Sequence, residues 1–295
     1  MPAPLIEKAP AKINLTLRVL GRREDGYHEL ESLVAFAGSD DLADKLTLHP
    51  GAKITLDISG PFSGPSGPAA GNLVLKAHAV LRQRIDGLKA GQFLLEKNIP
   101  VAAGLGGGSA DAAAALRLLA RLNALSVDDP RLAAAALEVG ADVPVCLASR
   151  SRIMRGIGDR LSPPLDLPQL ASVLVNPGVA LATRDVFAKF GDTFDTRPDR
   201  AEVPQQYDAL VEWLAHHDND LTPAATACAP VIAELLARMR DLPGARLARM
   251  SGSGATCFAL FATAGEAAAA AWLLQAGHED WWVIPAMLGS VENRP

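Results

Sequence analysis

Apolar and polar residues alternate from Ala11 to Leu20, where Ile, Leu or Val stands at every second position from residue 13. This period of two is typical of a half-buried strand. Lys12 and Asn14 belong to the polar set, so we expect both side chains on the same face of that strand. A polar turn at residues 21–26 ends in Asp-Gly, and residues 27–36 can return as a second strand.

The rest of the chain mixes helical and strand patterns without strict alternation. Helical spacing predicts helices at residues 72–85, 109–122, 128–139, 184–190, 205–215, 231–240 and 264–275. Strand-like runs stand within residues 45–58, 93–96, 152–154, 172–178, 246–250, 256–261 and 281–284. Asp142 is expected at a junction between a helix and a strand. This mixture predicts the α+β class in both halves, with the proline-rich segment 162–168 as the boundary between them.

The segment from Ile99 to Leu116, IPVAAGLGGGSADAAAAL, places four glycines in front of an alanine-rich helix. Glycine allows the backbone to adopt positive φ and to approach a ligand closely. Ser109 follows as the expected N-cap residue, and Asp111 suits the first helical turn. A glycine turn that opens onto a helix N-terminus offers N–H groups and the positive end of the helix dipole. The sequence therefore predicts a phosphate-binding site here.

This loop differs from the two best-known phosphate-binding motifs. No Gly-Lys-Ser or Gly-Lys-Thr closes it, which excludes a Walker A loop. A dinucleotide-binding fingerprint would need a third glycine where Ser109 stands, and it would belong to an opening βαβ unit. An ordinary turn would need only one or two glycines.

Composition and charge restrict the expected partners. The chain has 295 residues, 49% of them apolar and 21% charged, which fits a globular protein long enough for two domains. A formal net charge of -5 argues against a nucleic acid or an anionic membrane as the partner. Three widely spaced cysteines and the absence of a signal-peptide pattern or a membrane-length apolar run lead us to expect a reduced, cytoplasmic setting.

Four ordered segments resemble one known family. Residues 100–110, PVAAGLGGGSA, are similar to the phosphate-binding motif of the GHMP kinases, the galactokinase, homoserine, mevalonate and phosphomevalonate kinase superfamily. Residues 251–255, SGSGA, resemble its second glycine motif. Residues 10–30, PAKINLTLRVLGRREDGYHEL, and 140–147, GADVPVCL, narrow the resemblance to members that phosphorylate a diphosphocytidyl methylerythritol. One glycine loop would be weak evidence, whereas four motifs in the right order are specific.

The resemblance implies a two-domain GHMP-kinase fold, with an ATP-binding N-terminal domain (1–162) and a ferredoxin-like C-terminal domain (163–295). It implies transfer of the γ-phosphate of ATP to the 2-hydroxyl of the methylerythritol part of the substrate, in non-mevalonate isoprenoid biosynthesis. Lys12 and Asp142 match the catalytic pair. The residues that match the ATP-binding motif are Pro100, Gly104, Leu105, Gly106, Gly107, Gly108, Ser109 and Ala110. Those that match substrate contacts are Asn14, Tyr27, His28, Thr183 and Phe187.

Phosphoryl transfer requires positioning, neutralisation of charge and an acceptor for the proton of the attacking hydroxyl. Asp142 can accept that proton, and an ammonium at Lys12 would favour its carboxylate form and orient the hydroxyl. Taken alone, Asp142 could equally be a helix cap and Lys12 a solvated strand residue. Tyr27 and Phe187 could stack on a cytosine ring, or pack in the core. Mg²⁺ is expected to arrive with ATP, with Ser109 as a candidate ligand and no dedicated metal site.

Some positions depart from the family pattern. Gly71 stands where an acid commonly precedes the helix at residue 72, and Ala102 and Ala103 stand where glycine is common. Val34 occupies a position that can be aromatic. These departures concern recognition of the bases rather than the reaction.

Two alternative functions stay open on the sequence alone. One is a GHMP-type kinase for another small alcohol, such as mevalonate, although the Tyr27-His28 pair favours a cytidine substrate. The other is a catalytically silent nucleotide-binding regulator, which would be expected to lack the lysine or the base. Whichever of these functions the chain has, we expect it to be a monomer or a weak homodimer.

Overall fold

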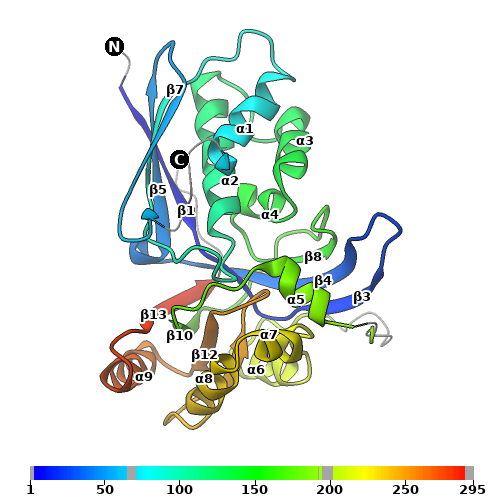
Figure 1. The fold of residues 1–295 in the computed structure, drawn as a ribbon, viewed down its shortest axis with the longest axis vertical. Helices are drawn as coiled ribbons and strands as arrows, with labels where there is room; N and C mark the ends of the chain where they lie inside the picture. The colour runs from blue at the N-terminus through cyan, green and yellow to red at the C-terminus, as the bar shows by residue number, and fades with distance from the viewer. Residues whose placement is uncertain (1–2, 65–70, 192, 195–201, 290–295) are drawn as a thin grey trace. The chain divides into compact units, whose positions relative to one another are not determined.

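The computed structural model describes residues 3–64, 71–191, 193–194 and 202–289, and its two compact units alternate along the chain (Figure 1). Unit 1 comprises residues 1–12, 39–101 and 106–149, and unit 2 comprises residues 13–38, 102–105 and 150–295. The chain thus changes unit inside the predicted strand and again inside the glycine loop. The two units interleave along the chain and do not divide it at one position. The predicted division into two domains after residue 162 therefore stays a prediction.

Unit 1 contains a sheet of strand order β1-β5-β7-β6. The strands are β1 (Leu5–Pro10), β5 (Ala43–Pro50), β6 (Thr55–Ser59) and β7 (Gly91–Glu96), and a 3-10 helix at Asp40–Leu42 precedes β5. Strand β5 pairs antiparallel with β1 and β7, whereas β6 and β7 are parallel. The sequence analysis did not predict β1, whose composition includes a proline. Its place at the edge of the sheet tolerates Pro10, because an edge strand has one side that needs no donor.

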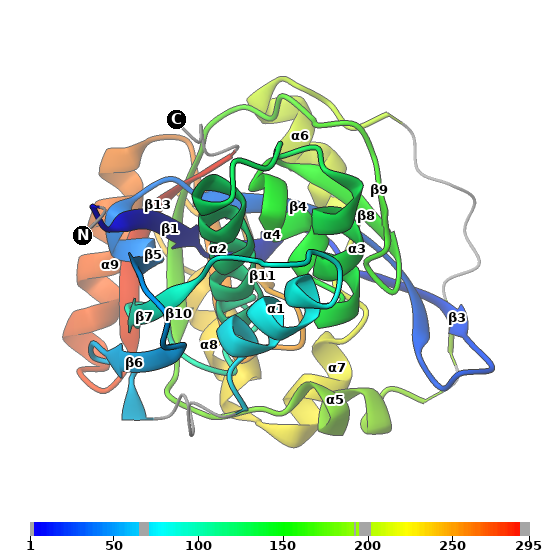
Figure 2. The same cartoon turned by 90° about the horizontal axis from the view of Figure 1, so that it is seen from above.

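Four helices gather on one side of this sheet, as both views show (Figures 1 and 2). They are α1 (Leu73–Arg82), α2 (Gly107–Leu122), α3 (Pro130–Val139) and α4 (Val143–Ala148). Helix α2 packs on β1 and β5 and contacts α1 and α4, and every residue from Ala110 to Ala120 is buried. Its alanines allow these close approaches on several sides. The strand expected after Asp142 is wrong, because residue 142 directly precedes α4.

Unit 2 is built on an antiparallel sheet of order β11-β12-β10-β13-β4-β8-β9, with β2 and β3 also paired to β4. Its strands are β2 (Lys12–Asn14, of which Lys12 belongs to unit 1), β3 (Arg18–Arg22), β4 (His28–Ala37), β8 (Arg152–Gly156), β9 (Arg160–Leu161), β10 (Leu170–Asn176), β11 (Leu247–Met250), β12 (Cys257–Phe261) and β13 (Trp282–Gly289). The second predicted strand is confirmed as β4, and Val34 is buried within it. The first is wrong as a single strand, since β2 and β3 are separate.

The polar face of residues 11–20 is also buried, which corrects the expectation of a half-buried strand. In unit 2, Arg18 is 1% exposed and donates to Glu31 over 3.0 Å, while Arg155 donates to the second oxygen of Glu31 over 2.9 Å. Burial opposes the charge of Glu31, but its hydrogen bonds to the two arginines lower its pKa below the usual value. The alternation predicts that this polar face contacts water, whereas in the structure Arg18 is paired with a buried carboxylate.

Helices cover one face of the unit 2 sheet. They are α5 (Thr183–Lys189), α6 (Tyr207–Ala215), α7 (Thr222–Cys228), α8 (Val231–Arg240) and α9 (Ala264–Gly277). Helix α9 packs on β10, β12 and β13, and α8 packs on β11 and β12 (Figure 1). The sequence analysis missed α7, whose small residues lack a clear apolar period. Sheets with helices in both units confirm the α+β class, and no helix in the described residues is long and apolar enough to span a membrane.

Candidate active site

Lys12 and Asp142 form an ion pair inside unit 1. The Nζ atom of Lys12 lies 3.0 Å from Oδ2 of Asp142, and the two side chains are 4% and 32% exposed. Asp142 stands at the N-cap position of α4, but its side chain makes no capping hydrogen bond. The Asp142 carboxylate therefore pairs with Lys12 and does not cap the helix. Lys12 is buried, so it is not a solvated strand residue.

Gly106 brings the glycine loop against this pair. It adopts φ +63°, and a Cβ built there would lie 3.0 Å from Cε of Lys12 and 3.9 Å from Oδ2 of Asp142. Gly106 is also the N-cap residue of α2, and it has no side chain to cap the first helical turn. The first N–H groups of this turn have no partner within the helix, so they can donate hydrogen bonds to an anion. Unit 1 thus brings the N-terminal end of a helix next to a cation and a carboxylate.

Two details of the predicted loop are wrong. Ser109 is not the N-cap residue, because the left-handed backbone at Gly106 allows α2 to begin at Gly107. Asp111 consequently lies beyond the first turn, where it is buried and paired with Lys97. Pro100 and Ala110 flank the turn in unit 1 and both are buried, while Gly107, Gly108 and Ser109 are partly or fully exposed in that turn.

The first half of the glycine loop belongs to unit 2 and contacts the second glycine motif. The Oγ atom of Ser251 donates to the carbonyl oxygen of Gly104 over 2.9 Å, and Thr256 N–H donates to the carbonyl of Ala103 over 3.2 Å. Ala102 has φ +53°, a left-handed conformation that glycine adopts without strain, so the departure at this position has a conformational cost. Leu105, which follows Gly104 in the chain, is buried.

Asn14 and Thr183 lie against the same SGSG turn in unit 2. The backbone N–H of Asn14 donates to Ser251 Oγ over 3.1 Å, and its side chain donates to Ser32 Oγ over 2.7 Å. The hydroxyls of Thr183 and Ser253 lie 2.9 Å apart. Ser251 and Ser253 were not among the predicted site residues, although the SGSGA motif that contains them was the signal for both.

The structure brings together two of the three predicted aromatic contacts. The rings of His28 and Phe187 stack with centroids 4.7 Å apart and planes 22° apart, and Phe190 meets His28 edge-on. Tyr27 precedes β4 and is 61% exposed, and its ring stacks on no other aromatic ring among the described residues. His28 therefore covers one face of the Phe187 ring.

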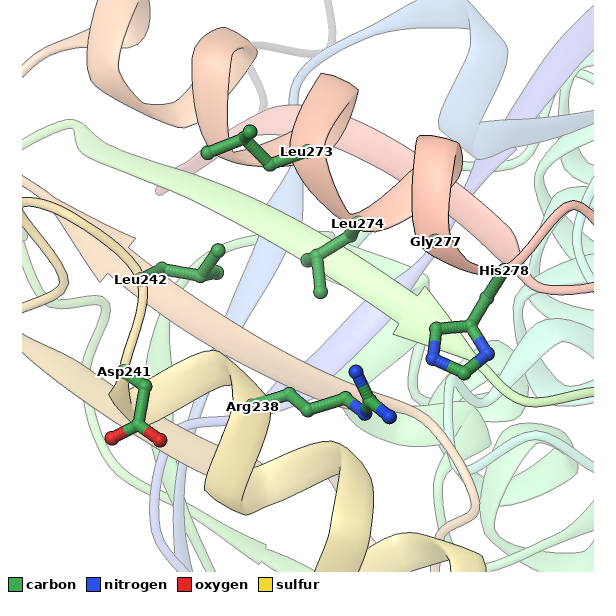
Figure 3. A pocket seen from close by; sticks show the side chains of 7 residues that line it. All are labelled: Arg238, Asp241, Leu242, Leu273, Leu274, Gly277 and His278. Carbon is green, nitrogen blue, oxygen red and sulfur yellow. The ribbon is translucent and has the colours of Figure 1, made fainter.

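A separate cavity of about 310 Å³ lies in unit 2 at the C-terminal ends of α8 and α9 (Figure 3). Arg238, Leu274 and His278 are among its lining residues, and none of the predicted site residues lines it. Arg238 is engaged by Glu234 one helical turn earlier, at 2.9 Å. This cavity adds no residue to the candidate site.

Comparisons with known proteins agree with this geometry. Residues 72–150 match the family model for the GHMP kinases N terminal domain, and residues 202–277 match the model for GHMP kinases C terminal. A glycine turn at the start of α2, the SGSG turn and these two matches define a GHMP kinase.

Relatives narrow the assignment. The chain is 54% identical to 4-diphosphocytidyl-2-C-methyl-D-erythritol kinase of Rhodopseudomonas palustris (strain BisB18), covering 97% of this chain and 95% of the relative. It is 54% identical to a kinase of the same name from Methylorubrum extorquens, with 96% and 99% covered. A crystal structure of 4-(cytidine 5'-diphospho)-2C-methyl-D-erythritol kinase superposes with a TM-score of 0.77 at 37% identity, covering 97% of this chain and 100% of that one. The chain belongs to the 4-diphosphocytidyl-2-C-methyl-D-erythritol kinase family, which confirms the resemblance found in its motifs.

Proposed function

We propose that the chain transfers the γ-phosphoryl group of ATP to the 2-hydroxyl of 4-diphosphocytidyl-2-C-methyl-D-erythritol, with Lys12 and Asp142 as the catalytic pair. One observation in unit 1 carries the proposal: the ion pair of Lys12 and Asp142 lies against Gly106, which opens α2. A proton acceptor, a cation and an anion-binding helix end are the groups that phosphoryl transfer to an alcohol uses.

Asp142 would accept the hydroxyl proton as the hydroxyl oxygen attacks the γ-phosphorus. Its carboxylate is 32% exposed, so a substrate can reach it, while the buried Lys12 holds it from the protein side. The Lys12 side chain also lies against Gly106, where its ammonium can neutralise charge on the transferred phosphoryl group. The bond from the γ-phosphorus to the bridging oxygen breaks, and ADP leaves with the negative charge.

Magnesium fits this arrangement as a companion of the nucleotide. Proteins bind Mg²⁺ through phosphate oxygens and one or two protein oxygens, and Ser109 is a partly exposed hydroxyl residue in the first turn of α2. Ser109 would be the protein ligand. When bound, the ion supplies further neutralisation of phosphate charge.

We assign substrate contacts to Asn14, Tyr27, His28, Thr183 and Phe187, the last four of them to its cytidine part. The stacked rings of His28 and Phe187 support this, because an aromatic face that accepts imidazole also suits a base. The hydrogen bond of Thr183 to Ser253 supports a role for Thr183 beside the SGSG turn.

A coupled assay of ADP release tests the reaction. The chain is incubated with MgATP and either 4-diphosphocytidyl-2-C-methyl-D-erythritol or mevalonate, and the phosphorylated position is read by phosphorus NMR. We expect turnover with the first substrate alone and a new phosphomonoester at the 2-position. Turnover with mevalonate would instead support the kinase for another alcohol, and ATP binding without turnover on either would support the silent regulator.

A further inference from the structure

A second group of charged side chains is buried in unit 1, apart from the catalytic pair. Asp44 on β5, Lys97 just after β7 and Asp111 on α2 have side chains that are 0%, 4% and 3% exposed. The Lys97 ammonium contacts Oδ2 of Asp44 and lies 2.8 Å from Oδ2 of Asp111. One lysine thus joins two carboxylates from different elements.

The network also fixes the backbone that leads into the glycine loop. Oδ1 of Asp44 accepts the N–H groups of Asn98 and Ile99 over 2.6 and 2.9 Å. The Lys97 N–H donates to the carbonyl of Ser59 over 2.8 Å. The segment just before Pro100 is therefore held by a side chain and by main-chain contacts.

The network lies directly against the first residue of α2. A Cβ built on Gly107 would lie 3.4 Å from Nζ of Lys97 and 3.6 Å from Oδ2 of Asp44. Asp111 is attached to the same helix one turn later. The charges of these groups therefore act close to the N–H groups assigned to phosphate, where the low dielectric of the interior weakens screening.

The formal charges of the three groups sum to -1, which would oppose an anion at this helix end. Oδ1 of Asp111 is buried and has no hydrogen-bond partner among the described residues. Burial raises the pKa of Asp111 to about 8, although the Lys97 charge opposes this. At neutral pH the network then holds one proton and carries no net charge.

Several other titratable or charged groups lie on elements packed against α2. Burial raises the pKa of the Cys146 thiol on α4 to about 12, and burial lowers that of His78 on α1. On β1, Glu7 pairs with Arg117 of α2 itself over 3.1 Å. Lys12 and Asp142 lie beside Gly106, just before α2 begins.

We propose that Asp44, Lys97 and Asp111 are positioning residues for nucleotide binding: they fix the start of α2 to β5 and to the residue that follows β7, and the buried Asp111 is held as its neutral acid, so that the three groups place no net negative charge beside the first turn. This rests on the proposed function in one respect, the assignment of the ATP phosphates to this turn.

The test compares Asp111→Asn, Asp111→Ala and the wild-type chain. Asparagine keeps the shape of the protonated acid and cannot ionise, whereas alanine removes the link to Lys97. Leu132→Ala, a core variant on α3 of unit 1, is the control for loss of stability alone. MgATP affinity is measured by calorimetry from pH 7.5 to 9.5, and KM for both substrates and kcat are measured at pH 7.5.

We expect Asp111→Ala to weaken MgATP binding by roughly tenfold or more with KM for the alcohol unchanged, as loss of a charge-assisted contact implies. Asp111→Asn should bind MgATP within about twofold of wild type at pH 7.5. Wild-type affinity should fall above pH 8 as Asp111 ionises, and this fall should be smaller in Asp111→Asn.

Equal pH profiles for wild type and Asp111→Asn would overturn the proposal. So would an effect of Asp111→Ala that Leu132→Ala reproduces at matched stability. If Asp111→Ala does not fold, the pH profile of Asp111→Asn decides. Failure of the wild-type chain to bind MgATP would instead contradict the proposed function.

Discussion

Lys12 Nζ and Asp142 Oδ2 lie 3.0 Å apart, although 130 positions separate the two residues in the chain. The lysine side chain is almost fully buried and the carboxylate is about one-third exposed. The pair therefore has a fixed side and an open side, the arrangement that a positioned proton acceptor requires.

Removal of the proposed base should abolish most turnover without loss of nucleotide binding. Asp142→Asn keeps the shape of the side chain but cannot accept the hydroxyl proton, so we expect kcat to fall by about 10²–10⁴-fold. Calorimetry should find MgATP affinity nearly unchanged. Asp128→Asn, at an exposed acid of the same unit, is the matched control. Near-normal turnover of Asp142→Asn would remove this residue from the mechanism.

The left-handed glycine at the start of α2 should be specifically required for nucleotide binding. Gly106→Ala places a Cβ 3.0 Å from Cε of Lys12 at φ +63°. Gly87 has a similar φ of +67° with nothing within 4 Å of such a Cβ, so Gly87→Ala controls for backbone strain. Both variants should lose about 1–2 kcal/mol of stability, and only Gly106→Ala should lose MgATP affinity. Equal affinities in the two variants would contradict the role of the turn.

Loss of an aromatic face should affect the cytidine substrate alone. Base stacking contributes about 1–3 kcal/mol, so Phe187→Ala and Tyr27→Ala should each raise KM for the diphosphocytidyl substrate roughly five- to a hundredfold. KM for ATP should stay nearly constant, and Trp272→Ala, at a side chain 71% exposed on α9, should change neither. A rise in KM for ATP instead would assign the altered residue to the nucleotide.

The pH dependence of stability should carry a contribution from Asp111. Burial raises the pKa of Asp111 from 3.8 to about 8, so the folded chain binds an extra proton between those values. Stability from this group is then lost as pH rises from about 4 to about 8. Urea unfolding from pH 5 to 8 should show a decrease in the free energy of unfolding that is smaller in Asp111→Asn. Parallel pH curves for the two proteins would rule this out.

The ion pairs of Glu31 should contribute strongly to the free energy of unfolding. Glu31→Gln removes the carboxylate that pairs with the buried Arg18, and breaking a buried pair costs about 3–5 kcal/mol. Glu234→Gln removes an exposed pair on α8 and should cost less than about 1 kcal/mol. Denaturant unfolding of both variants gives the comparison, and similar losses would show that burial does not govern these pairs.

The sequence by itself determined the glycine loop, most helices and strands and the order of the family motifs. These are local properties: four glycines followed by an alanine-rich run predict a turn and a helix, and no distant part of the chain is needed for that prediction. Resemblance of residues 10–30 and 140–147 then implied the pairing of Lys12 with Asp142, but their spacing alone gave no reason for it.

Only the tertiary structure decided which polar residues are buried and what they pair with. The alternation of residues 11–20 has the same period whether its polar side chains contact water or, as here, are buried, with Lys12 paired to Asp142 and Arg18 to Glu31. Likewise Asp111 suits a first helical turn by type, but the left-handed Gly106 moves the start of α2 and leaves Asp111 facing Lys97. A side chain's partner depends on which distant elements pack beside it, and local periodicity carries no information about that packing.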